Sequence, residues 1–367
     1  MNAANPGHEL PDLFRCENGA RVRTAADWRR RRAELQDLIL AIEYGRLPRI
    51  PAATEGEELH SHKVPRFLNA SHTQYRLITG PDPAYRFVLR VLVPPGDGPF
   101  PVILNGDACW RYVTDEITLA VLQRGYILAE FNRTEIVPDN GRSERTTGLY
   151  RACPDGDYGA LAAWAWGYHR CMDFLLTLPC VDADRIAAAG HSRGGKTVLL
   201  AGATDERIAL TAPNNSGACG AGCFRRQGPG SETLGDSIRG FPYWFGPRLK
   251  EFDGKEDSLP FDQHSLKALV APRALLTTEA LGDLWANPSG TWQTHLAARE
   301  AYRFLGAEER IGIWYRPGPH CHGAEDWAAL LDFADWHFRG LKPARRFNES
   351  PFAADPPAFS WSAPRLT

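Results

Sequence analysis

The chain has 367 residues, of which 43% are hydrophobic and 23% are charged, and its formal net charge is −2 at pH 7. This composition is ordinary for a folded globular protein, and so small a net charge gives no basic field to attract nucleic acid. No run of about 18 apolar residues occurs, so we expect no transmembrane helix. Residues 1–13 lack the apolar core of a signal peptide, so either the protein stays inside the cell or its leader is missing from this sequence.

Eight cysteines are spread over the chain, too sparsely for a scaffold built on disulfides, and none of them forms a CxxC pair. That absence argues against a zinc ribbon and against a thioredoxin-like redox site. The nearest pair, Cys219 and Cys223, lies in a glycine-rich stretch, and we interpret both as small packing residues.

The N-terminal part of the chain predicts one helix followed by loops. In residues 28–44 apolar side chains recur at three- and four-residue steps, which is typical of an amphipathic helix. Residues 45–72 are rich in proline, glycine and polar residues and predict a loop with short extended pieces. We therefore treat residues 1–80 as a helical and loop extension of the fold that follows.

From residue 85 onward, strand and helix patterns alternate. Short apolar runs predict strands at residues 86–93, 101–104, 125–131, 185–189, 208–212, 274–278 and 311–315. Helical patterns cover residues 158–178, 196–203, 292–305 and 324–338. This alternation predicts a mostly parallel central sheet with helices on both faces, a three-layer α/β sandwich. Residues 217–262 are irregular and aromatic and are interpreted as an insertion within a single domain of residues 1–367.

The motif that carries chemistry is Gly190-His191-Ser192-Arg193-Gly194, which lies between a predicted strand and a predicted helix. Glycines on both sides of the serine permit the strained turn that lifts its hydroxyl above the sheet, near a helix N-terminus that favours negative charge. The GxSxG pattern is weak alone. In this context it predicts Ser192 as the nucleophile of an α/β-hydrolase fold.

A serine nucleophile needs a base, and the base needs an orienting acid. In this fold the histidine follows the last strand, where the chain offers both His320 and His322. The acid follows the strand before it, where Glu279 and Asp283 are the carboxylates. We prefer Asp283, because a residue several positions beyond the strand can turn back toward the histidine. A zinc site at residues 320–322 lacks a companion ligand cluster.

These motifs resemble those of glucuronoyl esterases of carbohydrate esterase family 15. The similarity extends over roughly residues 85–340 and includes several spaced motifs in the same order. They are GHSRGGK (residues 190–196), AGATDERIALTAP (201–213), SG (216–217), YWFGPRLK (243–250), LPFDQH (259–264), APRALL (271–276), DLWANP (283–288) and, after His320, EDW (325–327).

The resemblance implies a serine esterase that cleaves the ester between 4-O-methyl-glucuronic acid of glucuronoxylan and lignin alcohols, without cofactor or metal. It implies Ser192 as nucleophile, His320 rather than His322 as base, and the backbone and side chain of Arg193 as oxyanion donors. Lys196 and Trp285 match positions that contact the uronate sugar. It further implies a secreted or periplasmic protein, which we expect to be a monomer that binds neither nucleic acid nor membrane.

Two positions depart from the family pattern. Asn215 stands where many relatives carry the catalytic glutamate, and an amide cannot act as a charged orienting acid. The resemblance then places the acid at Asp283. His191 stands where fungal relatives have a cysteine that bridges to the residue after the catalytic histidine, so we predict a free thiol at Cys321.

Two other functions fit the same sequence. One is an esterase for another carbohydrate ester, such as acetylated xylan, because fold and triad do not define a substrate. The other is a catalytically silent carbohydrate-binding homologue, which the loss of the usual glutamate favours. The aromatic insertion and Lys196 favour the uronate ester.

Overall fold

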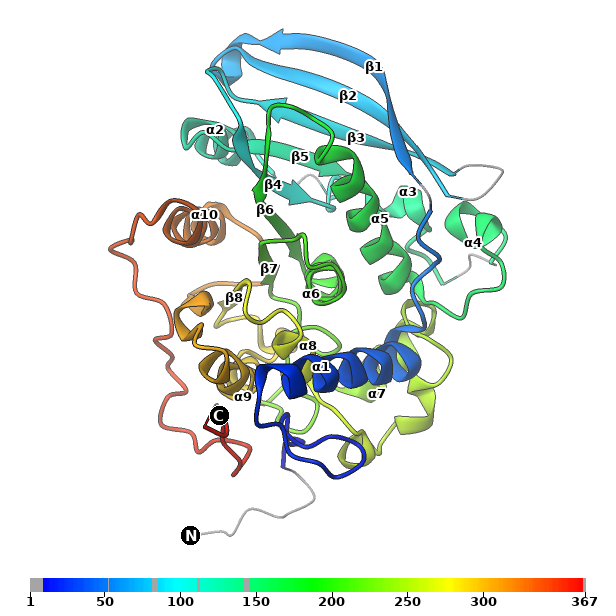
Figure 1. The fold of residues 1–367 in the computed structure, drawn as a ribbon, viewed down its shortest axis with the longest axis vertical. Coiled ribbons are helices and arrows are strands. Elements are labelled where there is room, and N and C mark those ends of the chain that lie inside the picture. Colours follow the sequence, from blue (N-terminus) through cyan, green and yellow to red (C-terminus); the bar gives the residue numbers. More distant parts are fainter. Residues whose placement is uncertain (1–8, 52, 81–84, 111–112, 142–144, 366–367) are drawn as a thin grey trace.

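A nine-stranded sheet runs through the computed structural model, which describes residues 9–51, 53–80, 85–110, 113–141 and 145–365 (Figure 1). Residues 1–8 lie outside the described residues. They make up most of the segment 1–13, for which the sequence predicts no signal peptide. The strand order is β1-β2-β3-β5-β4-β6-β7-β8-β9. The strands are β1 Thr54–Val64, β2 Ala70–Thr79, β3 Tyr85–Val93, β4 Phe100–Asn105, β5 Ile127–Phe131, β6 Val181–His191, β7 Leu210–Asn214, β8 Ala274–Ala280 and β9 Ile311–Arg316.

The sheet is parallel from β5 through β4 to β9, whereas β1, β2 and β3 pair antiparallel and β3 joins β5 antiparallel. The prediction of a mostly parallel sheet is therefore confirmed, and each strand predicted between residues 86 and 315 is present. Because parallel strands end at the same edge, the loops after β4, β6, β8 and β9 all gather at one edge of the sheet.

The strands β1 and β2 are longer than predicted, since the sequence of residues 45–72 predicts a loop with only short extended pieces. They form an antiparallel ribbon whose connection includes two left-handed residues, Leu68 (φ 58°) and Asn69 (φ 59°). Nearly every side chain of β1 is exposed, on both faces of the strand. A strand with no buried face has no alternation of apolar and polar residues, so the sequence carries no strand signal there.

Helices cover both faces of the sheet (Figure 1). They are α1 Ala25–Ile39, α2 Asp115–Gln123, α3 Arg133–Ile136, α4 Gly148–Ala152, α5 Ala160–Leu175, α6 Arg193–Thr204, α7 Leu234–Gly240, α8 Gln263–Ala268, α9 Pro288–Phe304 and α10 Ala324–Arg339. Alternate residues of one strand face opposite layers: Val102 and Leu104 join the apolar layer of α1, α5, α6, α8 and α9, while Ile103 joins that of α2 and α10. The three-layer prediction is confirmed.

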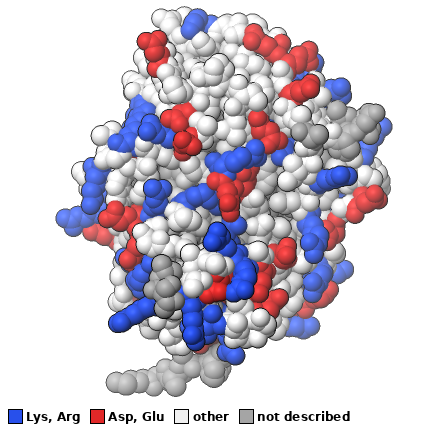
Figure 2. All heavy atoms as spheres, viewed as in Figure 1, with Lys and Arg blue, Asp and Glu red and all other residues white. Residues whose placement is uncertain are grey.

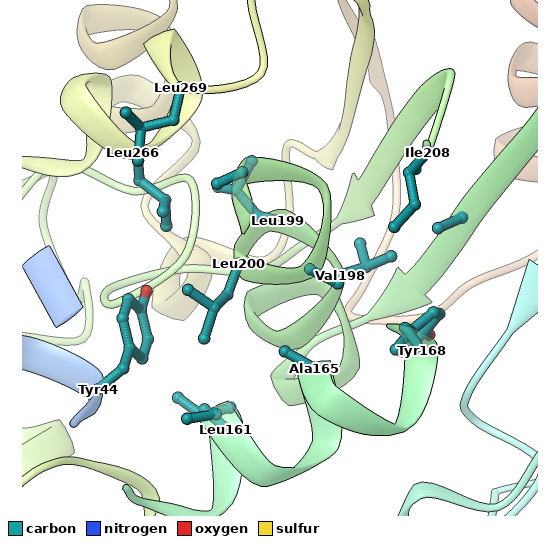
Figure 3. Close-up of a cluster of buried hydrophobic side chains, with 14 of the residues drawn as sticks. Tyr44, Leu161, Ala165, Tyr168, Val198, Leu199, Leu200, Ile208, Leu266 and Leu269 are labelled. Atoms are coloured by element: carbon teal, nitrogen blue, oxygen red, sulfur yellow. The ribbon is translucent and has the colours of Figure 1, made fainter. Parts of the chain in front are cut away.

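Helix α6 lies in the middle of the larger apolar layer. Its residues Val198, Leu199 and Leu200 are fully buried and meet side chains of α5 and α8 (Figure 3). Each such side chain contributes about 1.5–3 kcal/mol when it is buried. The helix is therefore firmly seated, and its N-terminus, which follows β6 directly, has a fixed place at the carboxyl edge of the sheet.

Charges of both signs are interspersed over the face of the molecule drawn in Figure 2, as the small net charge leads one to expect. Within the described residues, no helix combines the length and the apolar character that crossing a bilayer requires.

Candidate active site

Ser192 occupies a strained turn between β6 and α6. Its backbone has φ 55° and ψ −122°, a conformation that a non-glycine residue adopts only when its surroundings enforce it. A Cβ at Gly190 would collide with the carbonyl oxygen of Gly194, and a Cβ at Gly194 would collide with the carboxylate of Asp107. The backbone N–H of Ser192 donates to the carbonyl of Asn214 at 2.9 Å. Both glycines are thus needed for the turn.

The turn after β8 and the loop after β9 bring an acid and a histidine together. Nδ1 of His320 lies 2.5 Å from Oδ2 of Asp283. The Asp283 side chain is 4% exposed, whereas that of His320 is 40% exposed. A backbone bond from Gly282 N–H to the carbonyl of Gly318, at 3.0 Å, ties the two loops together. A buried carboxylate on Nδ1 directs the other ring nitrogen toward solvent and substrate.

The two alternatives left open by the sequence have different surroundings. Burial raises the pKa of the Glu279 carboxyl well above its ordinary value, and the buried ammonium of Lys267 opposes that rise. The ring of His322 is buried against Trp327, with ring centroids 5.0 Å apart and an interplanar angle of 27°. Burial lowers the pKa of His322 to about 3, so this ring remains neutral over the physiological range.

His191, which replaces a cysteine of the fungal pattern, packs between these histidines. Its ring centroid lies 4.4 Å from that of His320 and 5.8 Å from that of His322. Nδ1 of His191 contacts Oδ1 of Asn214 at 2.5 Å, and burial lowers the pKa of His191 to about 2. A neutral stacked ring thus stands beside the His320 loop. Cys321 forms no disulfide with any described cysteine. Its sulfur lies 3.0 Å from Nη2 of Arg316.

Asn215, which stands at the position of the usual glutamate, has a structural set of contacts. Its Oδ1 accepts the N–H of Ala280 at 2.8 Å, and its Nδ2 donates to the carbonyl of Cys321 at 3.4 Å. Its backbone is left-handed, with φ 42°. The amide therefore joins the end of β8 to the loop that carries His320.

A buried ion pair lies one helical turn beyond the serine. Nζ of Lys196 contacts Oε2 of Glu232 at 2.9 Å, and both side chains are 4% exposed. The N–H of Glu232 donates to the carbonyl of Trp285 at 2.9 Å, and the Trp285 side chain lies at the surface, 52% exposed. The bare Cα of Gly217 faces this group, since a Cβ there would lie 3.0 Å from the Glu232 carboxylate and 3.6 Å from Nζ of Lys196.

The family model described as "Glucuronyl esterase, fungi" matches residues 78–306, which is more than half of the chain. The chain belongs to the glucuronoyl esterases of carbohydrate esterase family 15. A family member of known structure, the glucuronoyl esterase from Caldicellulosiruptor kristjansonii, superposes with a TM-score of 0.86 at 31% identity, covering 97% of each chain. The α/β-hydrolase fold predicted from the sequence is thereby confirmed.

Curated relatives agree with this assignment. The carbohydrate esterase MZ0003 from an unknown prokaryotic organism is 38% identical over 60% of this chain and 55% of its own length. A 4-O-methyl-glucuronoyl methylesterase from Podospora anserina is 32% identical over 86% of this chain and 64% of its own length. The chain thus spans between half and two thirds of these two relatives.

The sequence alone indicates neither the role of Glu232 nor the surroundings of Arg193. Glu232 pairs with Lys196 across 36 residues of sequence, and its Ser-Glu-Thr context carries no recognisable pattern. The aromatic residues of the insertion favoured a sugar site, but Phe241 and Trp244 stack on each other, with ring centroids 3.8 Å apart, and on Arg193. Among the described residues, no group of three or more potential ligands could hold a metal ion.

Proposed function

We propose that this protein is a serine carboxylester hydrolase that cleaves the ester between 4-O-methyl-glucuronic acid of glucuronoxylan and lignin alcohols. The observation that carries the proposal is the contact of 2.5 Å between His320 and Asp283, on loops at the sheet edge where Ser192 stands in its strained turn. Family membership supports the choice of the glucuronate ester.

The reaction is a two-step acyl transfer. The Ser192 hydroxyl attacks the ester carbonyl while His320 takes its proton, and Asp283 stabilises the resulting imidazolium. The backbone N–H and the guanidinium of Arg193 receive the negative charge that develops on the carbonyl oxygen. His320 then gives its proton to the departing alcohol. In the second step His320 activates water, which attacks the acyl-enzyme and releases glucuronate.

Recognition of the sugar falls to Lys196, Glu232 and Trp285. An esterified uronate carries no charge, so its hydroxyls need donors and acceptors rather than a lone cation. The Lys196–Glu232 pair supplies both at one place and is close to neutral as a unit. The exposed Trp285 ring offers a flat face for the C–H groups of the sugar ring.

Hydrolysis of benzyl glucuronate, measured beside release of acetate from acetylated xylan, tests the proposal with wild type and Ser192→Ala. We expect wild type to prefer the glucuronate ester and Ser192→Ala to be inactive on it. Cleavage of acetylated xylan alone would make the protein an acetyl esterase on the same triad. Inactivity on both esters would favour a silent carbohydrate-binding homologue, and a serine-directed covalent probe would then fail to label Ser192.

We also propose that the protein is a secreted or periplasmic monomer that folds as one domain. Its substrate is a cell-wall polymer, which argues for action outside the cytoplasm. The larger apolar layer includes side chains from Leu13 to Ile311, which supports a single domain. Cell fractionation tests the location, and light scattering of the purified protein tests the monomeric state.

A further inference from the structure

We propose that Asp139 is a positioning residue, which fixes the guanidinium of Arg193 beside the nucleophile as part of a largely buried chain of alternating charges. The inference rests on the proposed function in one respect, namely that Arg193 stabilises the developing oxyanion. It predicts that a residue outside the triad, from the segment after α3, controls the rate of the chemical step.

The Asp139 carboxylate is held by four groups. Its Oδ2 lies 3.1 Å from Nη1 of Arg193 and 3.6 Å from Nη2 of Arg133. Its Oδ1 accepts the hydroxyl of Tyr243 at 2.9 Å and the indole N–H of Trp244 at 3.2 Å. With the side chain only 10% exposed, the carboxylate has a defined position and little access to water.

Arg133 extends the chain of charges inward. Its side chain is completely buried and forms an ion pair with Asp107, itself 2% exposed. The guanidinium lies over two indole rings, 4.0 Å from the centroid of Trp110 and 5.0 Å from that of Trp164. An arginine held between rings and carboxylates has no freedom to follow a displaced partner. Arg133 thus helps to fix the position of Asp139.

Asp107, at the other end of this chain of charges, contacts the backbone next to the nucleophile. Oδ2 of Asp107 accepts the backbone N–H of His191 at 2.7 Å, and His191 directly precedes Ser192. Arg193 directly follows Ser192. The order Asp107, Arg133, Asp139, Arg193 therefore begins and ends on the two neighbours of the serine. Its charges alternate and sum to zero, so the loss of one member leaves a buried charge without its partner.

Aromatic rings restrict Arg193 further. Its guanidinium carbon lies 4.7 Å from the ring centroid of Trp244 and 5.2 Å from that of Phe241. Nε of Arg193 is buried and has no hydrogen-bond acceptor among the described residues. Nε therefore does not face the substrate, and the ion pair of Nη1 with Asp139 together with the two rings fixes the guanidinium.

Two effects of Asp139 oppose each other, which makes its role testable. As a negative charge, it weakens the field of Arg193 at the oxyanion, so its removal would speed the reaction if only charge mattered. As an anchor, it keeps the guanidinium in place before the oxyanion forms, so its removal would slow the reaction. Preorganised donors are worth more than unfixed ones in a water-poor site, so we expect the anchoring effect to prevail.

The experiment compares wild type, Asp139→Asn, Arg193→Ala and the double variant. Three readouts are used: kcat and KM on benzyl glucuronate, the same constants on 4-nitrophenyl acetate, and the rate at which a fluorophosphonate phosphonylates Ser192 with loss of fluoride. Removing one oxyanion donor costs about 10²–10³ in kcat, and we expect about a tenfold loss for Asp139→Asn with KM changed less than about twofold. In the Arg193→Ala background Asp139→Asn should have no further effect.

Asp253→Asn is the matched control, since it makes the same change in the exposed ion pair with Arg239, whose atoms lie 2.9 Å apart. It should leave all three readouts at the wild-type level. If Asp139→Asn does not fold, Tyr243→Phe removes only the hydroxyl contact to Oδ1 of Asp139, and we expect a smaller loss that also vanishes without Arg193.

An unchanged or increased rate in Asp139→Asn would overturn the inference, and so would an equal loss in the presence and absence of Arg193. The phosphonate readout does not depend on the substrate. If wild type is labelled at Ser192 but leaves benzyl glucuronate intact, the proposed substrate is wrong, and the labelling rates of the variants still decide the role of Asp139.

Discussion

Replacing Asp283 by Asn is the sharpest perturbation of the proposed triad, because it changes the charge of the residue and almost nothing else. The Oδ1 of Asp283 accepts the N–H of Ala286 at 3.4 Å, and an Asn oxygen can accept the same bond. An Asn Nδ2 would then face Nδ1 of His320, which must become the acceptor. The proton of the ring moves to Nε2, and that nitrogen can no longer take a proton from Ser192.

The expected size of the effect follows from this geometry. Asp283 is 4% exposed, so water cannot substitute for the lost carboxylate. An amide in place of a triad acid lowers kcat by about 10⁴, which corresponds to about 5 kcal/mol of transition-state stabilisation. The Lys196–Glu232 pair is untouched, so KM for benzyl glucuronate should change less than about threefold.

The assay is steady-state hydrolysis of benzyl glucuronate from pH 5 to pH 9, with Glu279→Gln as the companion variant. Glu279 is the other carboxylate after β8, and burial raises its pKa well above the ordinary value, so we expect its amide to retain most of kcat. Activity of Asp283→Asn within tenfold of wild type would refute the assignment. A loss of activity in Glu279→Gln, with Asp283→Asn active, would move the acid to Glu279.

Three further outcomes are expected. Lys196→Met should raise KM for benzyl glucuronate by about ten- to a hundredfold, because it removes a buried hydrogen-bond donor worth about 1.5–3 kcal/mol. The kinetics on 4-nitrophenyl acetate should stay unchanged. Burial raises the pKa of Glu43 from 4.5 to about 7. Between these two pH values the folded state holds a proton that the unfolded state has lost. The free energy of unfolding should therefore fall by about 3 kcal/mol as the pH rises to 7. Oε1 of Gln263 has no hydrogen-bond partner among the described residues, and the amide of Glu43→Gln can donate to it. This variant should remove the slope in urea unfolding at pH 5 and pH 8. Gly190→Ala should lower Tm or prevent folding, because its Cβ meets the carbonyl of Gly194, and an unchanged Tm would contradict that contact.

The sequence predicts those parts of the fold in which burial imposes a period. Helix α10 shows its apolar face at residues such as Leu330 and Leu331, and both are almost fully buried. The exposed strand β1 has no such period, and its partner β2 buries residues at irregular spacing, so the sequence predicts neither as a long strand. The sequence also does not predict the short helices α2, α7 and α8, since fewer than three turns leave too few apolar repeats.

The candidate site was predictable where the order of the chain determines it. Ser192, Asp283 and His320 each follow a predicted strand, and strand ends meet at one edge of a parallel sheet. Asp139 and Glu232 follow no strand. They reach their partners across 54 and 36 residues of sequence, and nothing local marks such a pairing. A contact between distant side chains becomes visible only once the fold is known.

The segment of residues 217–262, which we interpret as an insertion, has a consequence for engineering. Loops of this kind are usually treated as exchangeable modules that alter which substrate an enzyme accepts. Here the same segment provides Glu232, which we propose to contact the sugar, and the ring pair of Phe241 and Trp244 against Arg193. A transplanted loop would therefore change the catalytic rate together with the specificity. Successful chimaeras of this scaffold would have to transfer the loop and the groups that contact Arg193 as one unit.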